Sequence, residues 1–307
     1  MRRAFSDTLV KIAAEDDHLL FVTGDLGFQV FDEYRSRFSA RYVNAGVAEA
    51  QMINFAAGMA ADGWHAIAYS IASFATARAF EQIRYCVSYP NLPVTIVGAG
   101  RGFTYGNSGV SHHAVDDVGL MTLLPNMTVV TPGDPTEIEQ LLPQVLRLPG
   151  PAYFTVGRFG EPRYDAREPA VLGRARLLQE GERVAIIGTG EVAGEISKAV
   201  ALLKEEGVEP AAYQMHTIRP LDTAALEHIA GESKIFVIVE EHMPRGGLWS
   251  AVTQWAATRD TPVRLRRLGP PEAFALGNVK RDDLRVRFNY DATAIAREVR
   301  ALWKHAC

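Results

Sequence analysis

The sequence has little of what marks several broad classes of protein. Its 307 residues include only two cysteines, Cys86 and Cys307, too few for a disulfide framework or a cysteine-bound metal. The formal net charge is −4, so there is no basic excess that would favour a nucleic acid or a membrane surface as a partner. No apolar run reaches the length of a membrane-spanning helix. What remains is an ordinary globular composition.

The first residues resemble the start of a secretory signal peptide, because two arginines follow Met1. Charged residues such as Asp7, Lys11 and Glu15 then interrupt the apolar core that a signal peptide needs. We therefore expect a cytoplasmic protein.

Strand-like and helix-like segments alternate along the chain, which is long enough for two domains with cores of their own. Short apolar runs, typical of buried parallel strands, predict strands at Leu19–Thr23, Trp64–Tyr69, Val94–Gly98, Met127–Thr131, Ala152–Val156, Val184–Gly188, Ala211–Met215 and Ile235–Val239. Between them, amphipathic or capped segments predict helices, among them one from Phe74 to about Tyr89 and ones that begin beside Asp134, Asp222 and Asp291. The pattern predicts an α/β fold with a doubly wound parallel sheet.

A polar stretch with two prolines, from Pro162 to Arg174, divides this pattern. We predict a first domain at residues 1–165, a linker at 166–175 and a smaller second α/β domain at 176–307.

Glu49 opens a helix that is apolar nearly all round from Ala50 to Ala61 and rich in small residues. Such a helix is expected to be buried on every side, against a neighbouring helix from this or another subunit. A carboxylate at its start would be poorly solvated and available for proton transfer. An acid in a first helical turn also simply complements the helix dipole.

The run Asn44-Ala45-Gly46-Val47-Ala48-Glu49, a strand ending at Ser70, and Phe74 ahead of Arg78–Arg84 resemble the pyrimidine-binding domain of transketolase-like enzymes. Those enzymes use thiamine diphosphate. The resemblance implies that Glu49 bonds a ring nitrogen of the cofactor's aminopyrimidine, and so helps its amino group take the proton from the thiazolium carbon.

The same resemblance gives roles to three more residues. Phe74 would stack on the aminopyrimidine ring, although an isolated phenylalanine is more often packed in a core. Ile71 stands where the family has a further aromatic residue, so that side of the pocket is apolar. Asp25 belongs to a loop near the thiazole side of the cofactor.

Gly24-Asp25 with Asn54 imitates the Gly-Asp-Gly…Asn signature by which thiamine enzymes hold a metal and the diphosphate. Leu26 occupies the third position, where its side chain would crowd a diphosphate, and Asn54 lies within the predicted helix. We therefore predict no metal site on this chain.

A long glycine-rich loop, residues 98–109, leads into His112 and His113, and loops of this kind are usually functional. Zinc is disfavoured, because adjacent side chains point in divergent directions. In the transketolase resemblance, Gly-x-Ser/Thr-His places His112 at the substrate, and His113 stands where the family has glutamine or another residue.

Two positions depart from the transketolase pattern. A histidine that helps to bind sugar phosphate falls on Gly100, and an acid that reads a substrate hydroxyl falls near Ser108. Arg158 keeps the position of a phosphate-binding arginine, although an arginine beyond a strand is equally a surface charge. The acceptor is therefore expected to differ from the usual aldose phosphates.

The second half contains Gly188-Thr189-Gly190-Glu191-Val192-Ala193, which fits a dinucleotide fingerprint only weakly, because no acid ends the next strand. With Glu240-Glu241-His242 and the paired glycines Gly246 and Gly247, this half resembles the transketolase C-terminal domain. That domain mainly serves dimerisation.

The resemblance covers nearly the whole chain. It includes no counterpart of the diphosphate-binding domain that full transketolases carry ahead of these two domains. It implies the second subunit of a split transketolase, with thiamine diphosphate shared with a partner chain that supplies the Mg²⁺ ligands, in a heterotetramer with homodimer contacts through this chain. The substrate would be a sugar or a 2-oxo acid. Chemistry like that of deoxyxylulose phosphate synthase or of a 2-oxo acid dehydrogenase β subunit is an alternative, as is a non-catalytic transketolase-like scaffold.

Overall fold

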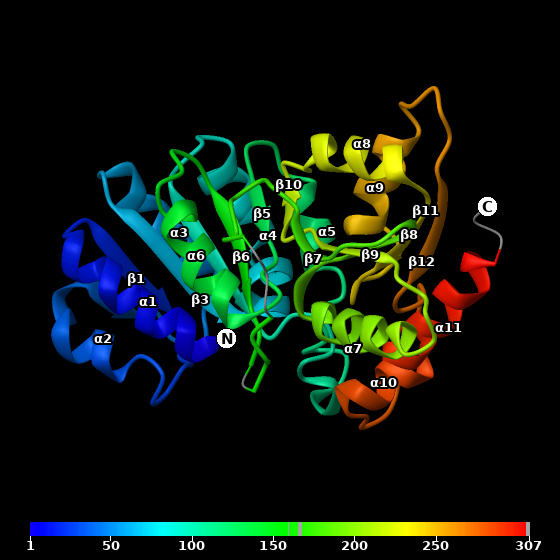
Figure 1. Cartoon of the computed structure of the whole chain (residues 1–307). Helices are drawn as coiled ribbons and strands as arrows, with labels where there is room; N and C mark the ends of the chain where they lie inside the picture. The colour runs from blue at the N-terminus through cyan, green and yellow to red at the C-terminus, as the bar shows by residue number, and fades with distance from the viewer. Residues whose placement is uncertain (159, 165–167, 305–307) are drawn as a thin grey trace.

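The strands gather into two sheets, one in each of two α/β domains that lie side by side (Figure 1). The computed structural model describes residues 1–158, 160–164 and 168–304. In the first domain it contains α1 (Arg2–Glu15), β1 (Leu19–Thr23), α2 (Asp32–Arg37), β2 (Tyr42–Asn44), α3 (Glu49–Ala61), β3 (His65–Ile71), α4 (Phe80–Gln82), β4 (Val94–Ala99), α5 (Asp117–Thr122), β5 (Thr128–Val130), α6 (Pro135–Val145) and β6 (Ala152–Val156). In the second it contains β7 (Arg176–Gln179), β8 (Arg183–Gly188), α7 (Ala193–Lys204), β9 (Ala211–Gln214), β10 (Thr217–Arg219), α8 (Thr223–Glu232), β11 (Ser233–Val239), α9 (Leu248–Ala256), β12 (Arg264–Leu268), α10 (Arg281–Arg287) and α11 (Ala292–Trp303).

The first sheet has the strand order β10-β5-β6-β4-β3-β1-β2 and is parallel except at β10. The register of β1 sets Thr23 beside Asn44 of β2 on one side and beside Tyr69 of β3 on the other. The carboxyl ends of these neighbouring strands therefore meet at one edge, which is where open α/β sheets bind ligands.

The second sheet has the order β12-β11-β8-β9-β7, with only β7 antiparallel to its neighbour among the described strands. Its strands β8 and β11 are apolar runs with helices on both faces, as the sequence predicts. The predicted α/β fold is thus confirmed in both domains.

Alternate residues of β1 point into two different cores. Leu19 and Phe21 join the core under α1 and α6, while Leu20 and Val22 join the core under α3. The α3 core continues without a break into the second domain, where it includes Phe236 of β11. The two domains therefore share part of one hydrophobic core.

The sequence missed the strand β10. It leaves the second domain just after β9 and pairs antiparallel with β5, with Thr217 opposite Val130, at the edge of the first sheet (Figure 1). The predicted last strand of the first domain, Ala152–Val156, is therefore not the last strand of the chain to join this sheet, because β10 joins it later. A three-residue strand formed from the other half of the chain leaves no periodic pattern to detect.

Two helix predictions need correction. The single helix predicted from Phe74 to about Tyr89 is instead α4 between two π-helical turns, Phe74–Arg78 and Ile83–Ser88. The prediction that α3 is buried on every side is wrong within this chain, because Phe55 is 36% exposed and a Cβ added to Gly58 would have no neighbour within 4 Å. Small apolar residues indicate close packing, but they do not say that the partner belongs to the same chain.

The predicted caps of three helices are confirmed: Asp134, Asp222 and Asp291 each accept a backbone N–H in the first turn of α6, α8 and α11. The predicted linker, 166–175, lies partly outside the described residues, so its limits stay a prediction. No helix in the described ranges is long and apolar enough to cross a lipid bilayer.

A buried ion pair joins the domains at their junction. Arg176, at the start of β7, is 5% exposed, and its Nη1 lies 3.2 Å from Oε1 of Glu137 and 3.7 Å from Oδ1 of Asp134, both at the start of α6. Burial raises the pKa of Glu137 to about 7, although Gly133 N–H and Arg176 oppose that rise. Arg176 is therefore the cation that allows two buried acids to face the second domain.

Arg176→Met should lower the free energy of unfolding by roughly 3–5 kcal/mol at pH 8, since removing one partner leaves buried carboxylates unpaired. The loss should be smaller at pH 6, below the pKa of Glu137, because that carboxyl can then hold a proton. Urea denaturation at the two pH values measures it. Arg174→Met, at an exposed position two residues earlier, is the matched control and should change stability by no more than about 0.5 kcal/mol. Equal losses in the two variants would contradict the prediction.

Candidate active site

The predicted site residues Asp25 and Glu49 lie at the carboxyl edge of β1, β2 and β3. Asp25 follows β1, with φ of +57°, a left-handed backbone that non-glycine residues seldom adopt. Its Oδ1 accepts a hydrogen bond from Asn44 Nδ2 at 2.8 Å, and Asn44 Oδ1 accepts from Gly46 N–H at 2.9 Å. These bonds fix the loop that enters α3.

Glu49 is the first residue of α3 and is 3% exposed, so the predicted burial of its carboxylate is confirmed. Ser70 Oγ, on β3, donates to Oε1 at 3.4 Å, and Arg78 Nη1 donates to Oε2 at 3.3 Å. Burial of a carboxylate is costly without such partners. Ser70 and Arg78 therefore stabilise Glu49 where the apolar helix begins.

A π-helical turn brings Phe74 and Arg78 onto one face. The guanidinium of Arg78 lies 4.0 Å from the centroid of the Phe74 ring, within the range of a cation–π contact. The ring of His112 meets Phe74 edge to face, with centroids 5.0 Å apart. Ser73 Oγ donates to Ser111 O at 2.9 Å and ties the His112 loop to this turn. π-helical turns are frequent at functional sites.

The two adjacent histidines diverge. His112 Nδ1 lies 2.9 Å from Ser111 Oγ, so Nε2 is on the far side of the ring from that contact. His113 is 7% exposed, and its Nε2 bonds Gly106 O at 2.9 Å inside the loop. In the described ranges no three His, Cys, Asp or Glu side chains form a group that could hold a metal ion.

Burial, the Arg78 charge and His113 together lower the pKa of His112 below the usual 6.5. A lowered pKa keeps the imidazole neutral at neutral pH, when it can accept a proton. Arg78 thus interacts with three predicted site residues: it forms an ion pair with Glu49, lies over the ring of Phe74 and helps to lower the pKa of His112.

Gly100 stands where the family has a histidine, and another side chain occupies the space beside it. Its φ is +71°, and a Cβ there would lie 2.3 Å from Cε2 of Tyr105. The Tyr105 ring therefore occupies the space that a side chain at position 100 would need. It lies 5.9 Å from the His112 ring, and Arg2 Nη2 donates a hydrogen bond to its hydroxyl.

Arg158 also lies over the Tyr105 ring, its guanidinium carbon 5.6 Å from the ring centroid. It is exposed and lines a cavity of about 610 Å³ between the domains, to which Asn107 of the loop and Lys280 of the second domain also contribute. Ser108 is exposed in the same short 3-10 turn as Asn107. Arg158 and His112 therefore both lie beside the ring of Tyr105.

Sequence reasoning missed two residues of this group. Tyr105 is one, and a lone aromatic residue in a glycine-rich loop was the available signal. Arg78 is the other, and its spacing of four residues from Phe74 is the signal that could have found it. Arg84, in the same stretch, is exposed. Ile71 ends β3 half-buried, just before the π-helical turn.

Comparison with known proteins identifies the family of both domains. Residues 1–159 match the family described as the transketolase pyrimidine binding domain, and residues 173–295 match the transketolase C-terminal domain. One of the subunits of the apulose-4-phosphate transketolase of Phocaeicola vulgatus is 31% identical, over 90% of this chain and 89% of its own. The 6-deoxy-6-sulfo-D-fructose transketolase subunit SqwH of Clostridium sp. is 33% identical, over 97% and 92%.

A solved structure described as a split gene transketolase, inactive beta4 tetramer, superimposes with a TM-score of 0.89 at 28% identity, covering 98% of this chain and 97% of that one. The 1-deoxy-D-xylulose-5-phosphate synthase of Symbiobacterium thermophilum also matches, at 31% identity, but this chain spans only 42% of its length. The match over full length is thus to separate transketolase subunits, and the chain belongs to the transketolase family.

Proposed function

We propose that this chain is the pyrimidine-binding subunit of a split, thiamine diphosphate-dependent transketolase. It would transfer a two-carbon ketol unit from a ketose donor to an aldehyde acceptor. The observation that carries the proposal is the group formed by Glu49, Phe74 and His112, linked through Arg78 at one edge of the sheet.

The residues present suit an aminopyrimidine. Glu49 offers a buried carboxylate to a ring nitrogen, Phe74 an aromatic face, and Ile71 an apolar wall. When bound, thiamine diphosphate supplies a carbon nucleophile from its thiazolium ring. Glu49 would hold the proton on the pyrimidine ring, and Asp25 would lie toward the thiazole side.

His112 and Arg158 would act on the substrate side. A neutral His112, with Nδ1 held by Ser111, directs Nε2 to accept or return a proton at the acceptor's oxygen. Arg158 presents a planar guanidinium fork suited to phosphate oxygens. Ser108 and His113 belong to the same loop and would shape this side of the site.

A partner chain would carry the diphosphate-binding domain and the Mg²⁺ ligands, in a cytoplasmic heterotetramer. The relatives named as subunits support this view, and so does the solved beta4 tetramer described as inactive. Homodimer contacts would run through this chain, where the exposed face of α3 offers small residues for close packing.

The substrate would differ from a standard pentose phosphate. Tyr105 fills the place where the family histidine would stand, which removes one donor to a sugar phosphate. The relatives are named for apulose 4-phosphate and for 6-deoxy-6-sulfo-D-fructose, both unusual sugars with an anionic end. Decarboxylation of a 2-oxo acid, as in deoxyxylulose phosphate synthase, is the second candidate, supported by the match to such a synthase.

The isolated chain should bind thiamine diphosphate weakly and turn nothing over, because no group of His, Cys, Asp or Glu side chains in the described part of the chain could hold the metal that neutralises the diphosphate. Calorimetry with Mg²⁺, with and without the partner chain, measures this. The partner is sought as a chain with Gly-Asp-Gly and a downstream Asn encoded beside this one. Tight binding by the isolated chain would contradict the split-subunit proposal.

Glu49→Gln should keep the fold and most cofactor affinity but slow proton exchange at the thiazolium carbon by roughly 10²–10⁴-fold, since an amide cannot relay the proton. Hydrogen–deuterium exchange at that carbon in the reconstituted complex measures the effect. Glu81→Gln, an exposed acid on α4, is the control and should exchange at the wild-type rate. A wild-type rate in Glu49→Gln would return Glu49 to a role at the helix dipole.

A panel of donors and acceptors should separate the roles of His112 and Arg158. His112→Ala should lower turnover with every acceptor, by roughly 10²–10⁴-fold if it moves a proton. Arg158→Ala should raise KM only for acceptors with a phosphate or sulfonate end. Equal effects of Arg158→Ala on charged and neutral acceptors would refute the anion role.

The same panel tests the identity of the substrate. Ribose 5-phosphate as best acceptor would show that Gly100 and Ser108 do not alter specificity. If the wild type turns over a 2-oxo acid donor, decarboxylation of a 2-oxo acid is favoured instead. If it turns over no substrate at all, the non-catalytic transketolase-like scaffold is favoured.

A further inference from the structure

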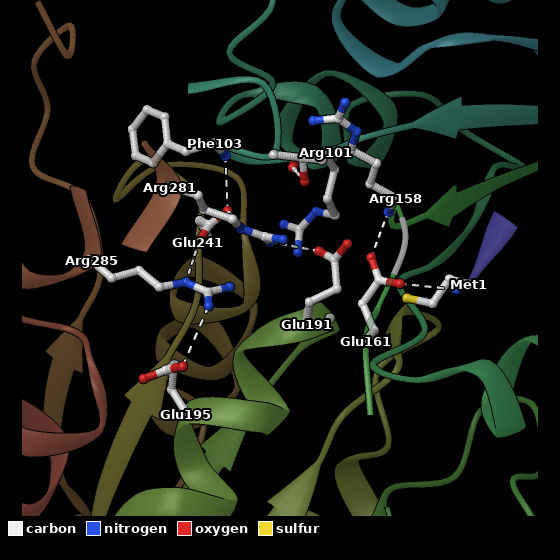
Figure 2. Close-up of polar contacts among 12 residues, drawn as sticks. Met1, Arg101, Phe103, Arg158, Glu161, Glu191, Glu195, Glu241, Arg281 and Arg285 are labelled. Atoms are coloured by element: carbon white, nitrogen blue, oxygen red, sulfur yellow. Dashed lines mark hydrogen bonds and ion pairs between the residues drawn. The ribbon is translucent and has the colours of Figure 1, made fainter. Parts of the chain in front are cut away.

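The loop that carries His112 rests on the second domain through one carboxylate. Glu241 lies just beyond the end of β11, is 1% exposed, and reaches across the domain junction to residues 100–116, the segment between β4 and α5. Its Oε1 accepts the backbone N–H of Phe103 at 2.8 Å, as Figure 2 shows.

Three side chains of the second domain hold the same carboxylate. Arg281 Nε donates to Oε1 at 2.7 Å, and Arg285 Nε donates to Oε2 at 3.0 Å (Figure 2). The Tyr290 hydroxyl also donates to Oε2, at 3.2 Å. With Phe103, both oxygens have two donors each. Glu241 is therefore fixed in orientation before it meets the loop.

The loop is shaped to admit this carboxylate. Gly102 has φ of +63°, and a Cβ there would lie 2.2 Å from Glu241 Oε1, so only glycine permits both the backbone and the contact. Gly102 N–H donates to Ala114 O at 2.7 Å, and Ala114 N–H donates to Gly102 O at 2.9 Å. These two bonds close the base of the segment that carries Tyr105 and His112.

Further contacts beside Glu241 also join this segment of the first domain to the second domain. Met243 N–H donates to Val115 O at 2.7 Å, and Gly119 N–H donates to His242 Nε2 at 3.0 Å. The Phe103 ring is buried against the second domain and meets the His113 ring edge to face at 5.0 Å. The loop is thus held at its base from one side, while His112 at its other side faces Phe74.

The arginines are held in turn by further acids. Arg281 Nη2 lies 2.8 Å from Glu191 Oε2, and Arg285 Nη1 lies 3.4 Å from Glu195 Oε1 (Figure 2). Burial alone would raise the pKa of Glu241, but Arg281, Arg285 and the Phe103 N–H lower it to about 2. The contact to the loop therefore keeps its charge at any working pH.

We propose that Glu241 is a positioning residue for the active-site loop: through the Phe103 N–H and Gly102 it fixes the place of His112 at the substrate. The catalytic consequence rests on the proposed function; the anchoring of the loop does not. By this account the second domain contributes to acceptor handling as well as to assembly.

Glu241→Gln tests the anchor. An amide has one acceptor oxygen and one donor group, so it cannot receive all four donors that now converge on the carboxylate. Hydrogen–deuterium exchange of the isolated chain should show faster exchange at Phe103 and across residues 102–114, with unchanged protection in α3. Glu240→Gln is the matched control, because Glu240 is equally buried and pairs with Arg267 inside the second domain. Equal exchange in the loop of both variants would overturn the proposal.

Gly102→Ala disturbs the same contact from the loop side without removing a charge, and serves if Glu241→Gln does not fold. It should reproduce the faster exchange across residues 102–114. Normal protection in a folded Gly102→Ala chain would equally overturn the proposal.

The reconstituted enzyme supplies the second readout. Glu241→Gln should lower kcat for transfer to the acceptor by roughly 10- to 100-fold, the scale of a small misplacement, while proton exchange at the thiazolium carbon, which depends on Glu49, stays at the wild-type rate. Loss of both activities, or of neither, would refute the positioning role. If the wild type itself transfers nothing, the proposed function fails, and the exchange data still decide whether Glu241 anchors the loop.

Discussion

Parallel pairing of β1 with β2 and β3 is the constraint on which the site depends. It brings the ends of three strands, far apart in sequence, to one edge, so that Asp25, Asn44 and Ser70 lie within reach of the start of α3. Glu49 is buried there because the helix that it opens must cover an apolar sheet face. The carboxylate is therefore placed by hydrophobic packing and stabilised by two polar neighbours.

The second domain is joined to the first by buried charges as well as by a shared core. Arg176 with Glu137, and Glu241 with Arg281 and Arg285, lie where the halves meet. Buried ion pairs add little net stability, because desolvation offsets their attraction, but breaking one is costly. Such pairs therefore act against misplacement: any slip between the domains would leave a buried charge without its partner.

Much of this arrangement can be predicted from the sequence. Continuous apolar runs located the strands β1, β4 and β6, and capping acids located α6, α8 and α11, because these signals are local. The gathering of Glu49, Phe74 and His112 followed from a family motif. Tyr105, Arg78 and Glu241 could not be assigned, because their roles depend on distances across the fold. Position 100 illustrates the limit, since the sequence indicates a missing side chain but not that Tyr105 occupies its space.

The strand β10 restricts where this protein can be divided. It belongs by sequence to the second half and completes the sheet of the first, beyond β5. A first half produced alone would expose the backbone of β5 as a free edge, the kind of surface that recruits strands from other molecules and leads to aggregation. A break of the chain between these two domains would therefore leave both products incomplete as folding units.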